Sequence, residues 1–186
     1  MDALADAEVA ALGGAGWFSR PSFLGDELAA SVRVKAASIS LRRAGVRREG
    51  QLDDAIRSDE LAWVTPDVFP EAVACFDALM TQLNERAWLG LRQFDLQLAR
   101  YQPGAKYVRH RDAFPGDDNR RITAIVYLNP AWSEADGGKL RLFTEPAIDI
   151  EPRMDRLVVF RSELIEHEVL PAHAERWALT AWYSAR

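Results

Sequence analysis

The second half of the chain is a succession of short extended runs separated by turn residues, and this pattern restricts the fold more than any other feature. Turn signals such as Pro103-Gly104, Pro115-Gly116 and Gly137-Gly138 separate runs rich in β-branched and aromatic residues. The predicted strands are 93–101, 106–112, 121–128, 139–143, 147–151, 156–160, 165–170 and 176–184. A series of about eight short strands is typical of a double-stranded β-helix, or jelly roll.

The first half of the chain is predicted to be mainly helical. Apolar residues recur at helical spacing in three segments: about 2–12, Phe23 to the mid-thirties, and Pro70 to about Trp88. Two shorter segments, Ser38 to Leu41 and Leu61 to Val64, are β-like. We expect the helices to cover a sheet, which makes the fold class α+β. The prediction is one domain over 1–186, with a helical support region of about 1–92 and a jelly-roll core of about 93–186.

Charge and composition disfavour several classes of protein. The net charge is −5 and the pI is near 5.3, so the overall field repels nucleic acid and anionic membranes. No apolar run could cross a bilayer and the N-terminus lacks the order of a secretory signal, so we expect a cytoplasmic protein, as a monomer. The single cysteine, Cys75, is interpreted as a small core hydrophobe. A basic cluster is predicted to be a solvated loop: Arg42, Arg43, Arg47 and Arg48.

A histidine and an aspartate, His110 and Asp112, stand two residues apart in the predicted strand 106–112. Strand alternation places Val108 on their face. The opposite face would carry Tyr107, Arg109 and Arg111. Burying an imidazole and a carboxylate together is costly unless a cation is bound, and the pair is two thirds of the facial triad that holds non-haem Fe(II). An exposed strand end is the alternative, and the metal site requires a third ligand, a distant histidine.

His167 is the candidate for that third ligand. In the run from Ile165 to Val169 it lies on an apolar face, while the glutamates on either side point to solvent. Alone, such a histidine is more often a core residue with its hydrogen bonds satisfied. Together with His110 and Asp112 it completes a ligand set. His173, in a turn, is expected to be an exposed loop residue.

The last predicted strand begins with Arg176, which alternation places on one face with Ala178, Thr180 and Trp182. At the surface this arginine would need no partner, but turned inward its guanidinium requires an anion. An arginine behind a metal site suits a dicarboxylate chelator such as 2-oxoglutarate, with one end on iron and the other on Arg176. The hydroxyl of Tyr127 could help to hold that carboxylate. Alternatively, Tyr127 is only a half-buried tyrosine of a strand.

Ordered motifs extend from about Leu96 to Tyr183, roughly half of the chain. They are Tyr101-Gln102-Pro103-Gly104, Tyr107 to Asp112, Arg120 to Thr123, Tyr127-Leu128-Asn129, Gly137 to Arg141, His167-Glu168-Val169 and Arg176 to Tyr183. This series resembles the 2-oxoglutarate- and Fe(II)-dependent prolyl 4-hydroxylases, and the hypoxia-sensing branch with its bacterial counterparts more than the collagen branch. Upstream, Ile56 to Asp59 looks like the mobile substrate-covering loop of that branch.

The resemblance implies a role for each matching residue. His110, Asp112 and His167 correspond to the iron ligands, and Arg176 to the partner of the distal 2-oxoglutarate carboxylate. Other positions of the co-substrate pocket match Tyr127, Tyr101 and Thr180. Positions near the peptide substrate match Arg57, Asp59, Arg120 and Trp182. The turn between Tyr101 and Tyr107 is one residue shorter than in the animal hypoxia sensors.

The resemblance also implies an activity: oxidative decarboxylation of 2-oxoglutarate to succinate, coupled to hydroxylation of a prolyl ring carbon, C4. The requirements would be Fe(II), 2-oxoglutarate and O2, with ascorbate in support, and the branch implies oxygen sensing. The expected substrate is another protein with an exposed prolyl residue, and by resemblance to bacterial members a translation factor such as elongation factor Tu. Because ligation needs neutral imidazoles, activity should fall as the histidines become protonated.

Two other functions are compatible with the same residues. An enzyme with the same iron and co-substrate could hydroxylate free proline or another small molecule, although the long polar segment from Arg42 to Asp59 favours an extended peptide. Alternatively, the chain could be a non-catalytic jelly-roll binding or sensor module with a structural metal. Zinc would accept two histidines and a carboxylate, but Arg176 and Tyr127 would then have no role.

Overall fold

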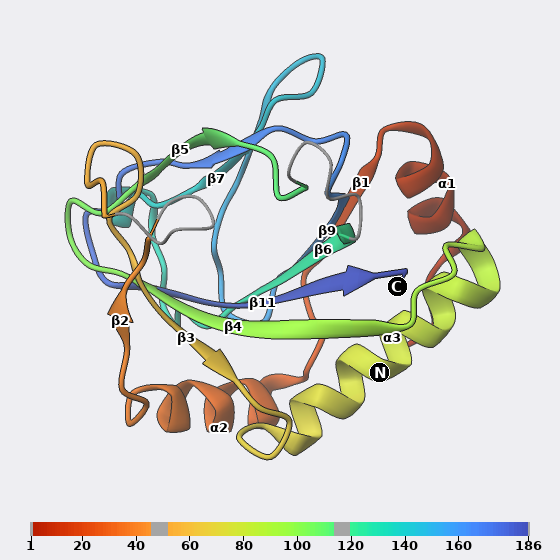
Figure 1. Ribbon diagram of the computed structural model, residues 1–186, viewed down its shortest axis with the longest axis horizontal. Coiled ribbons are helices and arrows are strands. Elements are labelled where there is room, and N and C mark those ends of the chain that lie inside the picture. Colours follow the sequence, from red (N-terminus) through yellow and green to blue (C-terminus); the bar gives the residue numbers. More distant parts are fainter. Residues whose placement is uncertain (1, 46–51, 114–119, 186) are drawn as a thin grey trace.

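The computed structural model describes residues 2–45, 52–113 and 120–185, and in it two antiparallel sheets pack face to face (Figure 1). The larger sheet has the order β1-β9-β6-β11-β4-β3-β2, and the smaller has the order β5-β10-β7-β8. The larger sheet is built from β1 (Trp17–Arg20), β2 (Arg42–Arg43), β3 (Glu60–Val64), β4 (Gln93–Tyr101), β6 (Arg120–Tyr127), β9 (Leu157–Arg161) and β11 (Arg176–Ser184). The smaller sheet is built from β5 (Tyr107–His110), β7 (Leu140–Leu142), β8 (Ile148–Ile150) and β10 (His167–Val169).

The eight strands predicted in the second half are all present, and they form the expected double-stranded β-helix. The first half adds three strands to the larger sheet, of which β3 contains the predicted segment Leu61 to Val64. The prediction of a strand at Ser38 to Leu41 was wrong, because the strand after the second helix consists of Arg42 and Arg43, fixed by pairing with β3. Strand β1 was not predicted and is held by pairing with β9. Arg47 and Arg48 lie outside the described residues.

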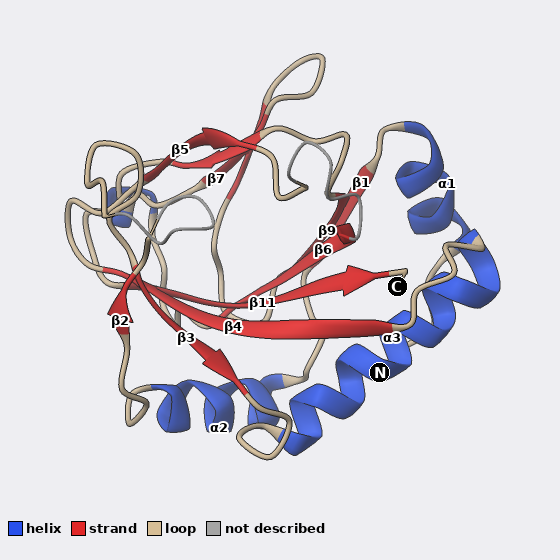
Figure 2. Ribbon diagram, viewed as in Figure 1, coloured by secondary structure: helices blue, strands red, loops and turns tan. Residues whose placement is uncertain are grey.

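Three α-helices lie in the first half, as the apolar spacing predicted: α1 (Asp6–Gly14), α2 (Asp26–Ala36) and α3 (Pro70–Ala87). A short 3-10 turn, η1 (Glu134–Asp136), follows later. Helix α3 begins at Pro70, whose fixed φ suits a first helical turn, and ends before Trp88 in the left-handed region. Helices α2 and α3 lie along the face of the larger sheet that is turned away from the smaller sheet (Figure 2).

Strand β11 shows how the layers divide the side chains, since all nine of its residues are buried. Trp177, Leu179 and Ala181 join the apolar core between the helices and the larger sheet. The residues that alternate with these three, among them Arg176 and Thr180, face the space between the two sheets. Period-2 alternation therefore separates an apolar helical layer from an inner face that carries polar side chains.

Asp155, in the turn before β9, ties the N-terminal region to the sheet. Its buried carboxylate accepts hydrogen bonds from the Ser22 hydroxyl and from the backbone N–H groups of Phe23, Leu24 and Gly25, at 2.7 to 3.0 Å. Four donors that precede α2 thus share one acceptor group. The contact joins segments about 130 residues apart in the sequence.

We expect Asp155→Ala to lower the free energy of unfolding by about 2–4 kcal/mol, because the donors beside α2 lose a buried acceptor. Asp155→Asn keeps one acceptor oxygen and tolerates the φ of 60°, so its loss should be smaller. Urea unfolding followed by circular dichroism measures both variants. A loss below about 0.5 kcal/mol for Asp155→Ala, the level of an ordinary surface substitution, would contradict this role.

Candidate functional site

A cavity of about 430 Å³ opens between the two sheets. Its lining includes the alternate residues of β11 that the sequence placed on one face: Arg176, Ala178, Thr180 and Trp182. Side chains from β3, β4 and β6 extend the same surface, and β5, β7 and β10 close it from the other sheet. The size is that of pockets for small ligands, and polar groups converge on it.

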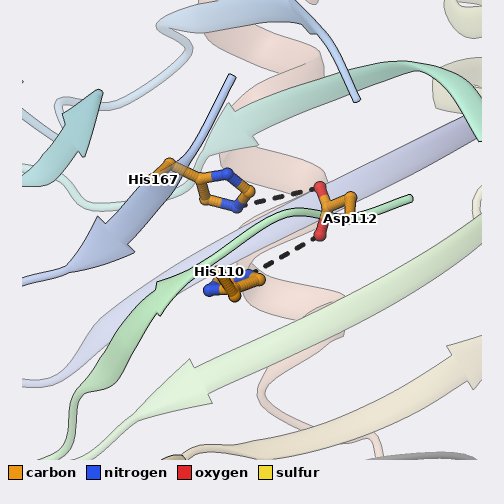
Figure 3. A group of neighbouring side chains, drawn as sticks. All are labelled: His110, Asp112 and His167. Atoms are coloured by element: carbon orange, nitrogen blue, oxygen red, sulfur yellow. Dashed lines mark ion pairs between the residues drawn. The ribbon is translucent and has the colours of Figure 1, made fainter. Parts of the chain in front are cut away.

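His110, Asp112 and His167 meet at this cavity (Figure 3). His110 ends β5 and is paired in register with His167, the first residue of β10, while Asp112 follows two residues after His110. The Asp112 carboxylate oxygens lie 3.6 Å from His110 Nε2 and 3.8 Å from His167 Nε2. One ligand atom from each residue falls within 4.8 Å of the others, so the three donors could hold a single metal ion. The predicted ligand set is thus brought together from two distant strands.

Neighbouring groups orient all three donors. The Nδ1 of His110 lies 2.8 Å from the Val108 carbonyl oxygen, and that of His167 lies 3.4 Å from the Ile165 carbonyl oxygen. An Nδ1–H donated to these acceptors leaves each Nε2 lone pair facing the cavity. The Thr123 hydroxyl donates to Asp112 at 2.7 Å. Such outer contacts are what fix metal-ligating side chains.

The electrostatics keep two of the donors, His167 and Asp112, in their metal-binding forms. Burial lowers the pKa of His167 to about 4, although Asp112 opposes the shift. For Asp112, burial alone would raise the pKa of the carboxyl, but the adjacent His167 and His110 outweigh it and hold the pKa well below its usual range. At neutral pH the site thus presents a neutral His167 imidazole and a carboxylate.

We expect the His167 imidazole of the metal-free protein to titrate near pH 4 instead of near 6.5. Since the unfolded chain then binds this proton more tightly than the folded one, the contribution to stability is complete above about pH 6.5 and is lost as the pH falls toward 4. Histidine-ring NMR across this range measures the midpoint, and His167→Asn assigns the signal. A midpoint near 6.5 would show that the ring is not desolvated.

Strand alternation wrongly predicted that the Tyr107 side chain points away from His110. Between the pairs His110 with His167 and Tyr107 with Val169, strand β5 has one residue more than β10, which is a β-bulge. The bulge turns the Tyr107 ring onto the face of His110, where the two rings stack at 3.6 Å. Arg111, also predicted to face away, lines the cavity.

Arg176 is buried, with only 3% of its surface exposed. Its Nε donates to the Gly138 carbonyl oxygen at 2.8 Å, and its guanidinium carbon lies 4.8 Å and 5.0 Å from the ring centres of Tyr101 and Tyr127. A Cβ at Gly138 would lie 2.9 Å from the Arg176 side chain, so glycine leaves the room it needs. Among the described residues no carboxylate forms an ion pair with Arg176. A buried cation of this kind lacks its counter-ion.

A second buried polar group that lacks a partner among the described residues lies beside Arg176. The Tyr127 hydroxyl is fully buried and has no hydrogen-bond partner among the described residues. Burial raises its pKa to about 12, against the opposing effect of Arg176, so the phenol keeps a proton that it can donate. Tyr127 itself is not part of the cavity wall, whereas Tyr101 and Thr180 are. An unpaired cation and an unused donor beside a metal-binding group fit a small dicarboxylate.

Of the four residues predicted near a peptide substrate, three line the cavity and one is buried behind its wall. Arg57, Arg120 and Trp182 line the cavity. Asp59 is instead buried behind Arg57, which it binds through two contacts of 2.6 and 2.9 Å. The Arg120 guanidinium stacks over the Trp182 ring at 4.4 Å. Asp59 is therefore placed to position Arg57 and does not itself face the cavity.

Two residues at the site were missed by the sequence reasoning. Thr123 holds Asp112 and also contacts the Ser162 hydroxyl at 2.8 Å. Gln97 lines the cavity and accepts a hydrogen bond from Arg57 at 3.3 Å. Thr123 lies opposite Trp182 across the sheet, so cross-strand register would have indicated it, whereas strand β4 carries no sequence signal that singles out Gln97.

Comparisons with known proteins agree with this geometry. A family model described as the 2OG-Fe(II) oxygenase superfamily matches residues 96–184. The human protein named prolyl hydroxylase EGLN3 is 33% identical over 187 residues, a match that covers 87% of this chain and 75% of that protein. The crystal structure of a Pseudomonas putida prolyl-4-hydroxylase is 36% identical and has a TM-score of 0.87, covering 97% of this chain and 98% of that one.

Two further relatives match over different lengths. Human Egl nine homolog 1 is 48% identical over 85 residues, which are 43% of this chain and 20% of that protein. The match therefore spans only about a fifth of the length of this relative. A Trichoplax adhaerens prolyl hydroxylase, solved in complex with a hypoxia inducible factor peptide fragment, is 31% identical, covers 96% of this chain and 87% of that one, and has a TM-score of 0.86. In the part of the chain that is described, no helix is long and apolar enough to cross a membrane.

Proposed function

Because the chain belongs to the prolyl hydroxylase family of 2-oxoglutarate- and Fe(II)-dependent oxygenases, we propose that it hydroxylates a prolyl residue, at C4, of another protein. The observation that carries the proposal is the His-Asp-His group beside a buried arginine that has no carboxylate partner among the described residues. The proposed catalytic unit is a single domain over residues 1–186.

In this function His110, Asp112 and His167 would hold the iron, and Arg176 would bind the distal carboxylate of 2-oxoglutarate. Iron with 2-oxoglutarate supplies the oxidising chemistry, with O2 as the second co-substrate and succinate and carbon dioxide as products. Three protein ligands leave coordination positions open for the co-substrates. A facial triad leaves such open positions, whereas a closed structural zinc site does not.

The chain's own residues would bind and orient the co-substrate and the peptide, and would shield the pocket from water. Arg176 offers a guanidinium whose remaining N–H groups suit a bidentate carboxylate, and the Tyr127 hydroxyl adds a donor beside it. Thr180 and Tyr101 complete the wall of the same pocket. Their burial excludes water, which strengthens each of these contacts. Arg57, positioned by Asp59, and Trp182 with Arg120 would contact the peptide at the cavity rim.

The proposed substrate is a protein and not a free amino acid. The relative from Trichoplax adhaerens was solved with a peptide fragment, and the cavity here continues outward over β2 and β3 beyond the metal-binding group. We propose elongation factor Tu as the first candidate, with oxygen sensing in the cytoplasm as the role, ascorbate as a supporting reductant and a monomer as the active form.

Incubation with Fe(II), 2-oxoglutarate and candidate proteins, including elongation factor Tu, tests the proposal. We expect succinate formation together with a +16 Da product whose modification maps to a prolyl residue. Hydroxylation of free proline without any protein product would instead support a small-molecule enzyme. Metal binding with no 2-oxoglutarate binding and no product would support the non-catalytic module and overturn the proposal.

A further inference from the structure

The cavity lining has a charge opposite to that of the whole molecule. Among the described residues it contains one carboxylate, Asp112, and six arginines: Arg42, Arg43, Arg57, Arg111, Arg120 and Arg176. The chain as a whole carries a net charge of −5. Positive charge is therefore concentrated at the opening of an acidic protein, where it can attract and orient an anionic partner.

Half of these six arginines already have a carboxylate partner. Arg43 pairs with Asp54, Arg57 with Asp59 and Arg111 with Glu166. Arg176 lies deep in the cavity, beside the two tyrosines. Two rim arginines remain without a carboxylate partner among the described residues: Arg42 and Arg120.

Arg42 faces the cavity because of its register in the larger sheet. It lies opposite Leu61 on β3, and Leu61 lies opposite Ala99 on β4. Residues directly opposite one another in an antiparallel sheet project from the same face, and Leu61 and Ala99 both line the cavity. The segment predicted as a solvated loop therefore places the exposed Arg42 at the outer end of the cavity floor.

The surface between the two unpaired arginines is aromatic. Trp63 and Trp182 lie with ring centres 5.4 Å apart, and Arg120 covers the Trp182 ring. Trp63 is 47% exposed. Trp63 follows Leu61, the partner of Arg42, by two residues, which is about 7 Å along a strand. The rim thus consists of an apolar platform with an unpaired arginine on either side.

We propose that this rim selects an acidic substrate segment, in which carboxylate side chains near the target prolyl residue pair with Arg42 and Arg120. This inference rests on the proposed function and names the chemistry of the protein that the site accepts. The tryptophans contact the apolar part of the segment, and the arginines contact its carboxylates. Arg42 acts as a specificity-determining residue, since it lies at the rim and away from the metal-binding group.

Three peptides test the proposal, with one prolyl core flanked by aspartate and glutamate, by asparagine and glutamine, or by lysine. Mass spectrometry gives kcat/KM for each, at low salt and in 0.5 M NaCl. We expect the acidic peptide to be favoured over the neutral one by about 5- to 10-fold at low salt and by about 2-fold or less at high salt, since exposed ion pairs are screened.

The variants Arg42→Glu and Arg153→Glu change the net charge equally. Arg153 pairs with Glu151 and does not line the cavity, so it is the matched control. Only Arg42→Glu should reverse the order of the acidic and lysine peptides. Equal turnover of all three peptides by the unmodified protein, or the same shift in both variants, overturns the proposal while prolyl hydroxylation stands. If no peptide or protein is hydroxylated although 2-oxoglutarate binds, the proposed function fails, and the inference fails with it.

Discussion

Replacing Arg176 with glutamine is expected to weaken 2-oxoglutarate binding by about 100-fold or more, and with it to remove turnover at micromolar co-substrate. The guanidinium is buried beside two tyrosine rings and has no carboxylate partner among the described residues, so the ligand carboxylate would be its counter-ion. A neutral amide cannot replace a charge-assisted, bidentate contact. Arg176→Lys keeps the charge but not the planar geometry, so an intermediate loss is expected.

Isothermal titration under anaerobic conditions, with Mn(II) in place of Fe(II), measures this affinity directly. Arg141→Gln is the control, because Arg141 pairs with Asp149 away from the cavity. Thermal melting adds an independent readout: 2-oxoglutarate should stabilise the original protein and the control but not Arg176→Gln. Unchanged affinity in Arg176→Gln would mean that the dicarboxylate binds elsewhere.

The second large effect is expected for Asp112→Ala, which should abolish detectable turnover and weaken Mn(II) binding by more than about 100-fold. Asp112 supplies the only carboxylate of the three-residue group, and metal affinity depends on that charge. Thr123→Val removes only the hydrogen bond that orients Asp112, so a loss of about 10- to 100-fold is expected.

Metal titration with circular dichroism as the folding check separates loss of the ligand from loss of the fold. Asp149→Ala, on the outer side of the smaller sheet, is the matched control and should bind Mn(II) normally. If Asp112→Ala bound metal with the original affinity, the three-residue site would be wrong even though the fold remained intact.

The strands that carry the site were predictable because alternation along an extended chain is a local property. Residues 93–101 and 176–184 were predicted with the bounds that the structure gives. The same rule placed Arg176, Thr180 and Trp182 on one face, and the structure shows that this face lines the cavity. Pairing of His167 with His110, by contrast, depends on long-range topology that no local pattern specifies. There the family resemblance supplied what periodicity could not.

The failures arose where tertiary contacts override local pattern. The bulge in β5 is a property of its pairing with β10, so the stacking of Tyr107 on His110 could not be read from alternation. Arg42 and Arg43 form a strand only because β3 lies beside them, since their own residues carry no β signal. Composition alone therefore described the basic cluster as solvated, and the position of Arg42 and Arg43 at the cavity required the structure.

A crystal structure of the protein with Mn(II) and 2-oxoglutarate, prepared without oxygen, tests the central claim most directly. The account predicts one metal ion bound by His110 Nε2, Asp112 and His167 Nε2, with the far carboxylate of 2-oxoglutarate on the Arg176 guanidinium and within reach of the Tyr127 hydroxyl. A metal held by other residues, or a 2-oxoglutarate whose far carboxylate leaves Arg176 unpaired, would contradict it.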